Sequence, residues 1–468
     1  MELTWNEVLA ATNAKVHSGK LRGNDAIPKI TTDTRKIETG DLFIALRGEN
    51  FDGAEFAADA LQKGASAVLV TEPLSKSVEK ALKNAKGAVL TVSDTLAAYQ
   101  AIAHAWRMKF GVPVVAITGS NGKTTTKDLT AAVLSARGTV CRTAANYNNE
   151  VGLPLTLLGM TGGDVAAVVE IGMRGLGQIA ALAPVAAPSI GIVTNVCEVH
   201  MELLGSIENI AKAKAELVQA IPVGGTVILN ADDARVAAMR SLAADGVRVL
   251  TYGIGADADV RAEALRLTSD GSQFMVTWNN ERHDYSIPLA GRHNVSNALA
   301  ALAAGFVLGY TPQEMQTGLR RLAVTKMRYE VHEVGAWTFI NDAYNASPSS
   351  MAAALETTAN LYEGRKIAVL GDMLELGDAA EEAHRRIGRR AAELGFAALV
   401  TYGPQSRWVH AAAEAAGCPV CCHAETHEAA AEHLRTLLRD GDTVLFKGSR
   451  GMKMEAVIAL LTGEEAGH

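Results

Sequence analysis

The stretch VPVVAITGSNGKTTTKDLTAAVLSA, residues 112–136, decides the fold class of this chain. Its apolar first part, VPVVAITG, is typical of a buried strand, and a helical pattern begins directly after a glycine-containing turn. A strand, a turn and a helix in this order begin a βαβ unit. Further apolar strands at VAAVVEIG, SIGIVTN and TVILNADD are separated by helical sequence. The alternation predicts a mainly parallel sheet with helices on both faces.

The same alternation divides the chain into three blocks, in line with a prior of about 150 residues per domain. Residues 1–108 hold short strands such as DLFIAL and AVLV and end in the helical stretch AAYQAIAHAWRMKF. Residues 109–325 hold the βαβ unit and QFMVTWNNERHDYSIPL, which predicts a hairpin that turns at Asn279 and Asn280. Residues 326–468 repeat the alternation with WTFINDAY, KIAVLGD, AALVTYG and TVLFKGS. We therefore predict a three-domain α/β protein whose central domain is a parallel-sheet phosphate-loop domain and whose C-terminal domain is Rossmann-like.

Composition limits the classes of function. Hydrophobic residues make up 48% and charged residues 20% of the chain, and the net charge of -7 disfavours a general nucleic-acid or membrane-surface binder. The acidic N-terminal sequence MELTWNEVLAATNAK is unlike a signal peptide. Residues 175–197 and 295–313 are uncharged, but prolines and glycines interrupt them, so neither predicts a membrane span. We therefore expect the protein to stay in the cytoplasm. We also expect a monomer that acts on small molecules, an expectation that composition itself does not provide.

The cysteines suggest one alternative site. Cys418, Cys421, Cys422, His423 and His427 have a spacing that superficially resembles a zinc site. The first four fall within GCPVCCHAE, residues 417–425, where the alternating pattern predicts a short strand. The strand is the favoured interpretation, because such spacing alone is a weak signal.

The turn after the first central strand has the composition of a phosphate loop. Its residues are Gly119, Ser120, Asn121, Gly122, Lys123, Thr124 and Thr125. Backbone N–H groups at the start of a helix favour phosphate oxygens, Lys123 adds positive charge, and Thr124 suits magnesium. The first glycine of the general pattern would fall at Ile117, so the loop is a variant. The alternative is an ordinary strand-to-helix turn, but the flanking strand and helix favour binding of ATP with magnesium.

Two further polar residues follow apolar strands. Glu170 ends VAAVVE and His200 follows SIGIVTN, so both are predicted at the carboxyl edge of the sheet. A carboxylate suits magnesium, whereas histidine is a less usual ligand for that hard cation. Taken alone, a residue such as Glu170 is more often a solvated strand end, and a residue such as His200 is more often a surface or core histidine.

Several motifs together resemble one family. In chain order they are TGSNGKTTT, NYNNEVGLPLTLL, Glu170-Ile171-Gly172, TNVCEVHMELLGSIENIAKAKAEL, ILNADD, GRHNVSNALA, NDAYNASPSSM, VLGDMLELG and KGSRGMKME. Their kind and order resemble those of Mur ligases, the ATP-dependent amide-bond-forming enzymes of peptidoglycan synthesis. The N-terminal TTDTRKIETGDLFIALRGENFDG resembles the UDP-sugar-binding domain of that family. The resemblance therefore covers nearly the whole chain.

Within the family, NASPSSM, GDMLELG and KGSRGMKME resemble the branch that joins D-alanyl-D-alanine to UDP-MurNAc-tripeptide. The neighbouring branch that adds a diamino acid is expected to carry Asp-Asn-Pro-Arg, which the sequence lacks. Folylpolyglutamate synthases usually have Gly-Lys-Gly-Ser in the loop, where this chain has Gly-Lys-Thr-Thr. The implied reaction forms an acyl phosphate from ATP and the tripeptide carboxylate, which the dipeptide amine then attacks.

The resemblance also implies roles at the reaction centre. It assigns Thr124 and Glu170 to a first magnesium ion and places His200 near a second. Lys214 matches a lysine that is carbamylated in several relatives and would then serve as a magnesium ligand. An unmodified Lys214 that pairs with phosphate or Glu216 is the alternative, and Lys212 is predicted on a solvated helix face.

The remaining site residues are also implied by the resemblance. The catalytic group comprises Lys123, His200, Lys214 and Arg328, and the contacts to ATP add Asn294, Asp342 and Asn345. The substrate-binding group comprises Thr34, Arg35, Arg47 and Gly48 near the uridine diphosphate, Asn148 and Asn149 in the central block, and Lys447, Ser449 and Arg450 toward the dipeptide. Two positions depart from the family pattern. Met327 precedes Arg328 where glycine is more common, and Gln178 replaces a frequent acidic residue.

Other functions remain open from the sequence. A neighbouring Mur ligase that adds a single amino acid is the nearest alternative. A nucleotide-gated binding protein without turnover is disfavoured by the combination of Glu170, His200 and Lys214. A Rossmann dehydrogenase is weaker still, because no G-x-G-x-x-G follows the first strand of either α/β block. Lysine and diaminopimelate remain equally open as the third residue of the tripeptide.

Overall fold

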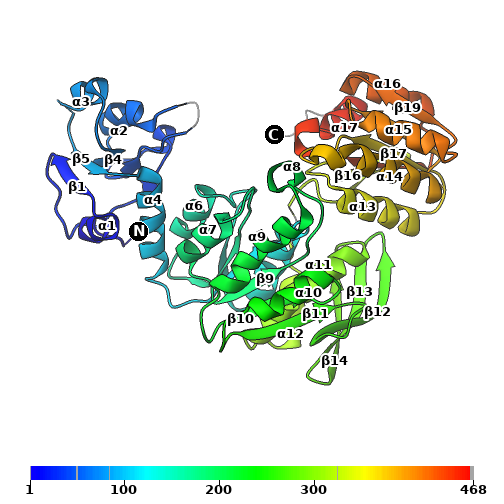
Figure 1. The fold of residues 1–468 in the computed structure, drawn as a ribbon, viewed down its shortest axis with the longest axis horizontal. Helices are drawn as coiled ribbons and strands as arrows, with labels where there is room; N and C mark the ends of the chain where they lie inside the picture. Colours follow the sequence, from blue (N-terminus) through cyan, green and yellow to red (C-terminus); the bar gives the residue numbers. More distant parts are fainter. Residues whose placement is uncertain (1, 49–50, 84, 324, 464–468) are drawn as a thin grey trace. The chain divides into compact units, whose positions relative to one another are not determined.

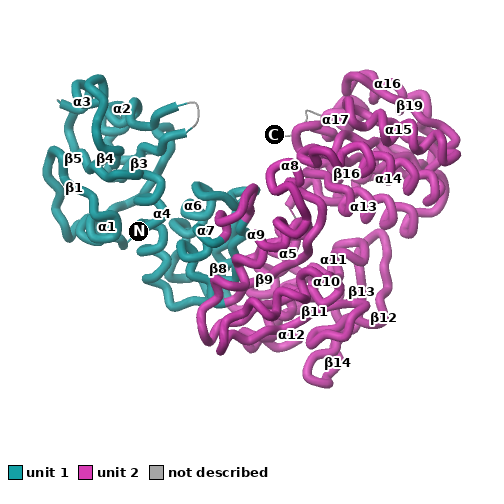
Figure 2. The backbone as a smooth tube through the Cα atoms, viewed as in Figure 1, with its two compact units in different colours: residues 1–116, 138–171, 180–189 teal, residues 117–137, 172–179, 190–468 magenta. Residues whose placement is uncertain are grey.

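The computed structural model describes residues 2–48, 51–83, 85–323 and 325–463. The chain divides into two compact units, which Figure 2 shows in different colours. Unit 1 comprises residues 1–116, 138–171 and 180–189, and unit 2 comprises residues 117–137, 172–179 and 190–468. Among the described residues, no helix has the length and apolar character needed to cross a membrane.

Unit 1 begins with a five-stranded sheet in the order β1-β5-β4-β3-β2. The strands are β1 (Lys15–Ser18), β2 (Ile30–Thr31), β3 (Leu42–Ile44), β4 (Ala67–Thr71) and β5 (Ala88–Val92). Only β1 runs antiparallel to its neighbour. Strands β4 and β5 are almost continuously buried, as expected for a parallel sheet covered on both faces.

All the helices of this part except α2 (Ala57–Gln62) begin at polar caps. The others are α1 (Trp5–Thr12), η1 (Thr34–Lys36), η2 (Gly53–Phe56), α3 (Lys76–Leu82) and α4 (Thr95–Arg107). Thr4 and Glu7 form a reciprocal capping box at α1, and the Asp94 carboxylate accepts hydrogen bonds from two backbone N–H groups at the start of α4. At the other end of α4, the buried Arg107 side chain donates to the carbonyl oxygens of Phe110 and Val112. This helix is thereby joined firmly to the segment that follows it.

The rest of unit 1 is a second α/β segment. Its elements are β7 (Thr139–Arg142), α6 (Gly152–Leu158) and β8 (Asp164–Glu170), with most of α7 (Gln178–Ala186). Strands β7 and β8 pair in parallel. The predicted strand VAAVVE is confirmed, and its final five residues are all buried.

Unit 2 contains the helix that follows the phosphate loop. After the end of β6 (Val114–Thr118), its elements are α5 (Lys123–Leu134), β9 (Ile190–Val193), α8 (Met201–Leu204), α9 (Ile207–Ala220), β10 (Thr226–Asn230), α10 (Ala234–Ala238), β11 (Arg248–Gly253), β12 (Val260–Thr268), β13 (Gly271–Trp278), β14 (Glu281–Ile287), α11 (Arg292–Val307) and α12 (Pro312–Leu319). Strands β9 to β12 pair in parallel, and β12 to β14 form an antiparallel extension. Asn279 and Asn280 have left-handed backbone conformations between β13 and β14. The predicted hairpin and its turn are therefore confirmed.

The C-terminal part of unit 2 is a six-stranded sheet in the order β15-β16-β20-β17-β18-β19. Its strands are β15 (Glu330–Val334), β16 (Trp337–Asp342), β17 (Lys366–Gly371), β18 (Ala398–Tyr402), β19 (Cys421–Ala424) and β20 (Thr443–Lys447). Its helices are α13 (Pro348–Leu361), α14 (Ala380–Glu393), α15 (Ser406–Ala415), α16 (His427–Leu437) and α17 (Glu455–Thr462), which Figure 1 shows around the strands. Only β15 is antiparallel to its neighbour.

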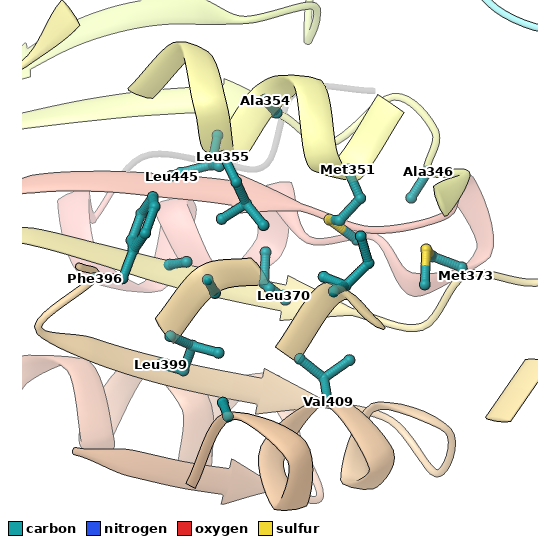
Figure 3. Packing of buried hydrophobic residues seen from close by; sticks show 14 of the residues in the cluster. Ala346, Met351, Ala354, Leu355, Leu370, Met373, Phe396, Leu399, Val409 and Leu445 are labelled. Carbon is teal, nitrogen blue, oxygen red and sulfur yellow. The ribbon is translucent and has the colours of Figure 1, made fainter. Parts of the chain in front are cut away.

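Each face of this C-terminal sheet has its own core because side chains alternate along a strand. Leu370 and Leu399 pack with α13, α14 and α15, whereas Val369 and Val400 pack with α16 and α17. Figure 3 shows Met351 of α13 beside the strand residues of the first core. The buried sheet fixes where each strand ends, and the loops that carry site residues follow those ends.

Strand β19 contains Cys421, Cys422 and His423, so the predicted strand in GCPVCCHAE is confirmed. Within the described parts of the chain, no group of three or more histidine, cysteine, aspartate or glutamate side chains is arranged to hold a metal ion.

Candidate active site

The phosphate loop connects the end of β6 to the start of α5. Thr194 donates its backbone N–H to Thr118, at 3.0 Å, and Ser120 donates to Asn195, at 2.9 Å. Gly119 has φ 148° and Gly122 has φ 79°, both in the region that favours glycine. A Cβ atom on Gly119 would lie 1.8 Å from the Thr194 Oγ1 atom. The path of the loop therefore depends on glycine at this position.

Asn121 holds the middle of the loop. Its backbone N–H donates to Asn195 Oδ1 at 2.8 Å, and its carbonyl oxygen accepts from Thr194 Oγ1 at 2.7 Å. Its side chain donates to Ser349 Oγ at 2.8 Å and accepts from Ser347 Oγ at 3.1 Å. Because both serines lie at the start of α13, Asn121 joins the loop to the C-terminal sheet of unit 2.

Two cationic side chains meet the loop. Lys123 Nζ donates to the carbonyl oxygens of Gly119 and Ser120, at 2.9 and 3.0 Å. Arg328 donates from Nη2 to Thr124 Oγ1 at 2.9 Å. The N-terminus of α5 lies at the same place and adds the positive end of its dipole. The structure thus brings three features that favour phosphate to one loop.

Arg328 occupies an unusual backbone segment. Its neighbours Met327 and Tyr329 both have left-handed conformations, with φ 59° and 54°. Its guanidinium lies 4.1 Å from the centre of the Tyr344 ring, a distance typical of a cation–π contact. Tyr329 donates its backbone N–H to Asp342 Oδ1 at 3.1 Å. Sequence reasoning gave Tyr344 no role, although it lies between Asp342 and Asn345 in a motif that was singled out.

Lys214 is buried in α9. Burial lowers the pKa of its amine well below the ordinary value, and the charge of nearby Lys123 lowers it further. A lysine in this setting loses its proton more readily than an exposed lysine. Lys212 is exposed, which confirms its predicted position on a solvated helix face.

His200 precedes α8 in a left-handed conformation, with φ 53°. Its Nδ1 atom lies 2.5 Å from the Glu375 carboxylate, which belongs to the loop after β17. This hydrogen bond is the main cause of the lowered pKa of Glu375. Sequence reasoning had quoted the GDMLELG segment but had not singled out Glu375, because no local pattern indicates a partner 175 residues away.

Glu170 ends β8 in unit 1 and is buried. Its Oε1 atom accepts a hydrogen bond from Asn148 Nδ2 at 2.8 Å, and its backbone N–H donates to Thr143 Oγ1 at 3.0 Å. Asn149 has a different contact, because its Oδ1 atom accepts from the Gly152 N–H at 2.9 Å where α6 begins. Asn148 thus orients the carboxylate, and Asn149 stabilises the start of a helix.

The polar residues of the C-terminal sheet pair with one another. Lys447 is buried, and its Nζ atom lies 2.6 Å from Asp342 Oδ2 and 2.9 Å from the Asn345 carbonyl oxygen. Ser449 Oγ accepts from the Leu374 N–H at 2.9 Å. Since Asp342 balances the charge of Lys447, the predicted contact of Lys447 with a dipeptide carboxylate competes with this pair.

Two other predicted residues have local partners. Arg450 is half-exposed and forms an ion pair with Glu455 at 2.5 Å. Asn294 is buried at the start of α11, where its Nδ2 atom donates to the Ala290 carbonyl oxygen at 2.8 Å and its Oδ1 atom accepts from Asn297 Nδ2 at 3.3 Å. Asn294 therefore stabilises the turn that begins this helix.

The N-terminal candidates lie on the surface of unit 1. The Arg35 side chain is 86% exposed and pairs with Asp33 at 2.9 Å. The hydrogen bond from Arg35 lowers the pKa of Asp33 to about 2. Arg47 is 77% exposed and lies 4.0 Å from Asp52. Thr34 begins the short helix η1, which carries Arg35. These side chains are accessible to an anionic ligand in solution.

Comparisons with known proteins agree with this architecture. Residues 26–107 match the description "Mur ligase family, catalytic domain", residues 117–305 match "Mur ligase middle domain", and residues 327–450 match "Mur ligase, glutamate ligase domain". A protein of Bacillus subtilis (strain 168), named UDP-N-acetylmuramoyl-tripeptide--D-alanyl-D-alanine ligase, is 39% identical over 92% of this chain and 92% of its own length. The chain belongs to the Mur ligase family. The family and such relatives are named as ligases, enzymes that form peptide bonds.

Other Mur ligases give the same result. A Synechocystis relative with the same name is 41% identical over 94% of this chain and 92% of its own length. MurF from Acinetobacter baumannii superposes with a TM-score of 0.89 at 30% identity, covering 98% of this chain and 99% of that structure. MurF from Thermotoga maritima, solved in complex with ADP, has a TM-score of 0.82 at 25% identity. The match covers 94% of this chain and 98% of that structure. The predicted three-domain α/β fold is thereby confirmed, and the boundaries after residues 108 and 325 stay predictions.

Proposed function

We propose that this chain is an ATP-dependent ligase that joins D-alanyl-D-alanine to UDP-N-acetylmuramoyl-tripeptide and releases ADP and phosphate. The observation that carries the proposal is the match over more than nine-tenths of the chain to relatives that share this one name. The reaction would supply the pentapeptide precursor of peptidoglycan. Because ATP drives it, we place it in the cytoplasm. We propose three domains, residues 1–108 for the UDP-sugar, 109–325 for ATP and 326–468 for the acceptor and ATP.

ATP is the first substrate, and the loop from Gly119 to Thr125 would hold its phosphates. The backbone N–H groups of the loop and the start of α5 suit phosphate oxygens. Lys123 and Arg328 carry the positive charge that a transferring phosphoryl group requires, and both already contact the loop. Asn294, Asp342 and Asn345 are proposed to contact the rest of the nucleotide.

Chemistry begins at the terminal carboxylate of the tripeptide. One carboxylate oxygen attacks the γ-phosphorus, the bond to the β-phosphate bridging oxygen breaks, and an acyl phosphate and ADP result. The dipeptide amine then attacks the acyl carbon and loses a proton, and phosphate leaves with the former carboxylate oxygen. Activation is needed because a carboxylate is a poor electrophile.

The residues assigned to magnesium suit a hard cation. Glu170 supplies a carboxylate that Asn148 orients, and Thr124 supplies a hydroxyl. Bound magnesium would neutralise phosphate charge during transfer. His200 is proposed near a second ion, and Lys214 as a carbamylated lysine. The burial that lowers the pKa of Lys214 supports the latter assignment, because only the neutral amine adds carbon dioxide.

The other two substrates would meet residues on different domains. Thr34, Arg35, Arg47 and Gly48 are proposed at the uridine diphosphate, since arginine suits phosphate oxygens. Asn148 and Asn149 are proposed near the rest of the nucleotide-sugar substrate. Lys447, Ser449 and Arg450 are proposed to face the dipeptide, and Arg450 is the most exposed of the three.

The test is phosphate release from ATP with purified UDP-MurNAc-tripeptide and one acceptor at a time. D-alanyl-D-alanine should stimulate release and give a ligated product, whereas single amino acids should not. A single amino acid that served better would replace this proposal with a neighbouring Mur ligase activity. Absence of stimulation by every acceptor would contradict a ligase. Parallel assays with lysine and diaminopimelate at the third tripeptide position identify the natural donor.

A further inference from the structure

The contact between His200 and Glu375 joins two loops that are distant in sequence. His200 follows β9, and Glu375 follows β17 in the C-terminal sheet of unit 2. Besides the 2.5 Å contact between His200 Nδ1 and the Glu375 carboxylate, the Glu202 backbone N–H donates to the Glu375 carbonyl oxygen at 3.3 Å. Both the backbone and the side chain of Glu375 therefore meet the segment that begins at His200.

Both partners have a costly backbone conformation. His200 has φ 53° and Glu375 has φ 65°. Left-handed conformations of residues other than glycine cost of order 1–3 kcal/mol each and persist where the surroundings impose them. Such residues concentrate at functional sites. The two loops are thus built to direct these side chains toward each other.

The loop that carries Glu375 is held from the C-terminal side. The Met373 N–H donates to His384 Nε2 at 3.0 Å, and the Leu374 N–H donates to Ser449 Oγ at 2.9 Å. His384 is fully buried, and its Nδ1 atom contacts the Ala380 carbonyl oxygen at 2.7 Å. These bonds fix the two residues before Glu375, so the direction of its side chain is set independently of His200.

We infer that Glu375 is a positioning residue that fixes the ring orientation and the tautomer of His200. A carboxylate at Nδ1 favours the tautomer that carries its proton there, which leaves the Nε2 lone pair for a ligand. The effect of Glu375 on the His200 ring does not depend on the proposed function. Only the statement that His200 acts in ligation rests on it. It adds a residue from the C-terminal domain to the reaction centre, so this centre is complete only when the two loops meet.

A purely structural role for Glu375 gives different expectations. A second ion pair joins the loop after β9 to helix α14, which follows the loop of Glu375, because Arg386 Nη2 lies 2.8 Å from Glu198 Oε2. This pair is made by Glu198, two residues before His200, and not by His200 itself. Arg386→Gln therefore weakens the same interface and leaves the partner of His200 in place. It is the matched control for Glu375→Ala.

The first experiment measures the nitrogen chemical shifts of the His200 imidazole in the full chain without nucleotide or metal. The ring should carry its proton on Nδ1, and Arg386→Gln should leave the spectrum unchanged. Glu375→Ala should shift the ring toward a mixture of tautomers, and Glu375→Asp should restore part of the preference. An unchanged spectrum in Glu375→Ala, or an equal change in Arg386→Gln, would overturn the inference.

The second experiment is a double-mutant cycle in the ligation assay. Loss of a carboxylate behind a functional histidine typically costs about 10–100-fold in activity, so Glu375→Ala should lower kcat by that amount. KM for the dipeptide should change less than kcat. In the His200→Ala background, Glu375→Ala should have no further effect, and an equal loss in both backgrounds would contradict positioning. Full activity of His200→Ala alone would refute the proposed role of His200, while the tautomer measurement would still decide the role of Glu375.

Discussion

The phosphate loop and the N-terminal arginines are both proposed to bind phosphate groups, but they are built differently. The loop is shaped by sterics and backbone hydrogen bonds, with Gly119 against Thr194 and Asn121 against Asn195. Arg35 instead extends from a three-residue helix and is 86% exposed. The loop is thus ordered before a ligand arrives, whereas ordering of Arg35 would cost side-chain entropy on binding.

The difference indicates which kinetic constant should change when each region is mutated. A preorganised loop acts on the transferring phosphate, so a change there should lower the rate of chemistry. An exposed arginine that contacts a remote diphosphate contributes similar binding in the ground state and the transition state, so its loss should raise KM. Measuring kcat and KM for variants of the two regions would test this assignment of kcat effects to the loop and KM effects to the arginine.

The largest effect is expected for Lys123→Ala. Removing one preorganised charge from a transition state typically costs about 10²–10³-fold in kcat, and this lysine should lie at the upper end or beyond. The fold should persist, because α5 remains buried by its apolar residues. Lys212→Ala, an exposed lysine of α9, is the control and should keep full activity. Full ligation by a folded Lys123→Ala variant would remove the phosphate loop from the mechanism.

Gly119→Ala tests the sterics of the loop without removing a charge. Its Cβ atom would lie 1.8 Å from Thr194 Oγ1, and φ 148° is unfavourable for alanine. We expect a loss of about 1–3 kcal/mol in the free energy of unfolding, together with weaker ATP binding. Gly111→Ala meets no atom within 4 Å and should be neutral. Equal stability of the two variants in denaturant titrations would show that the loop is not sterically fixed.

The sequence was sufficient where the signal is local. The strand before Gly119, the helix after Lys123 and the turn at Asn279 depend on neighbouring residues, and all three were predicted. Burial of Glu170 was not readable, because a strand end is compatible with either solvent or a site. The structure shows that the Glu170 side chain is buried and that Asn148 donates a hydrogen bond to its carboxylate.

The sequence failed where partners come from distant segments. Glu375 and Tyr344 gave no local signal, because their roles arise from contacts with His200 and Arg328. For Lys447, the sequence suggested a positive charge available to a substrate. Asp342, which is 105 residues away, already balances it. Motifs fix which residues gather at strand ends, but only the packed sheet determines which of them pair with one another.

The smallest effect is expected for Arg35→Ala, which tests the other side of the comparison. A lost charge-assisted hydrogen bond to a diphosphate should raise KM for UDP-MurNAc-tripeptide by roughly tenfold. KM for ATP and kcat should change little, because the residue touches neither the loop nor the reacting carboxylate in the proposed arrangement. Stability should also change little, since the ion pair of Arg35 with the partly exposed Asp33 lies at the surface.

Lys36→Ala is the matched control, because it removes an exposed positive charge from the same short helix. It should leave KM for UDP-MurNAc-tripeptide, KM for ATP and kcat unchanged if the contact depends on the arginine itself rather than on local charge. An equal rise in KM for both variants would indicate a diffuse electrostatic effect, which higher salt would weaken. A fall in kcat with Arg35→Ala would break the comparison, because it would mean that the N-terminal arginine acts on the reacting groups as the phosphate loop does.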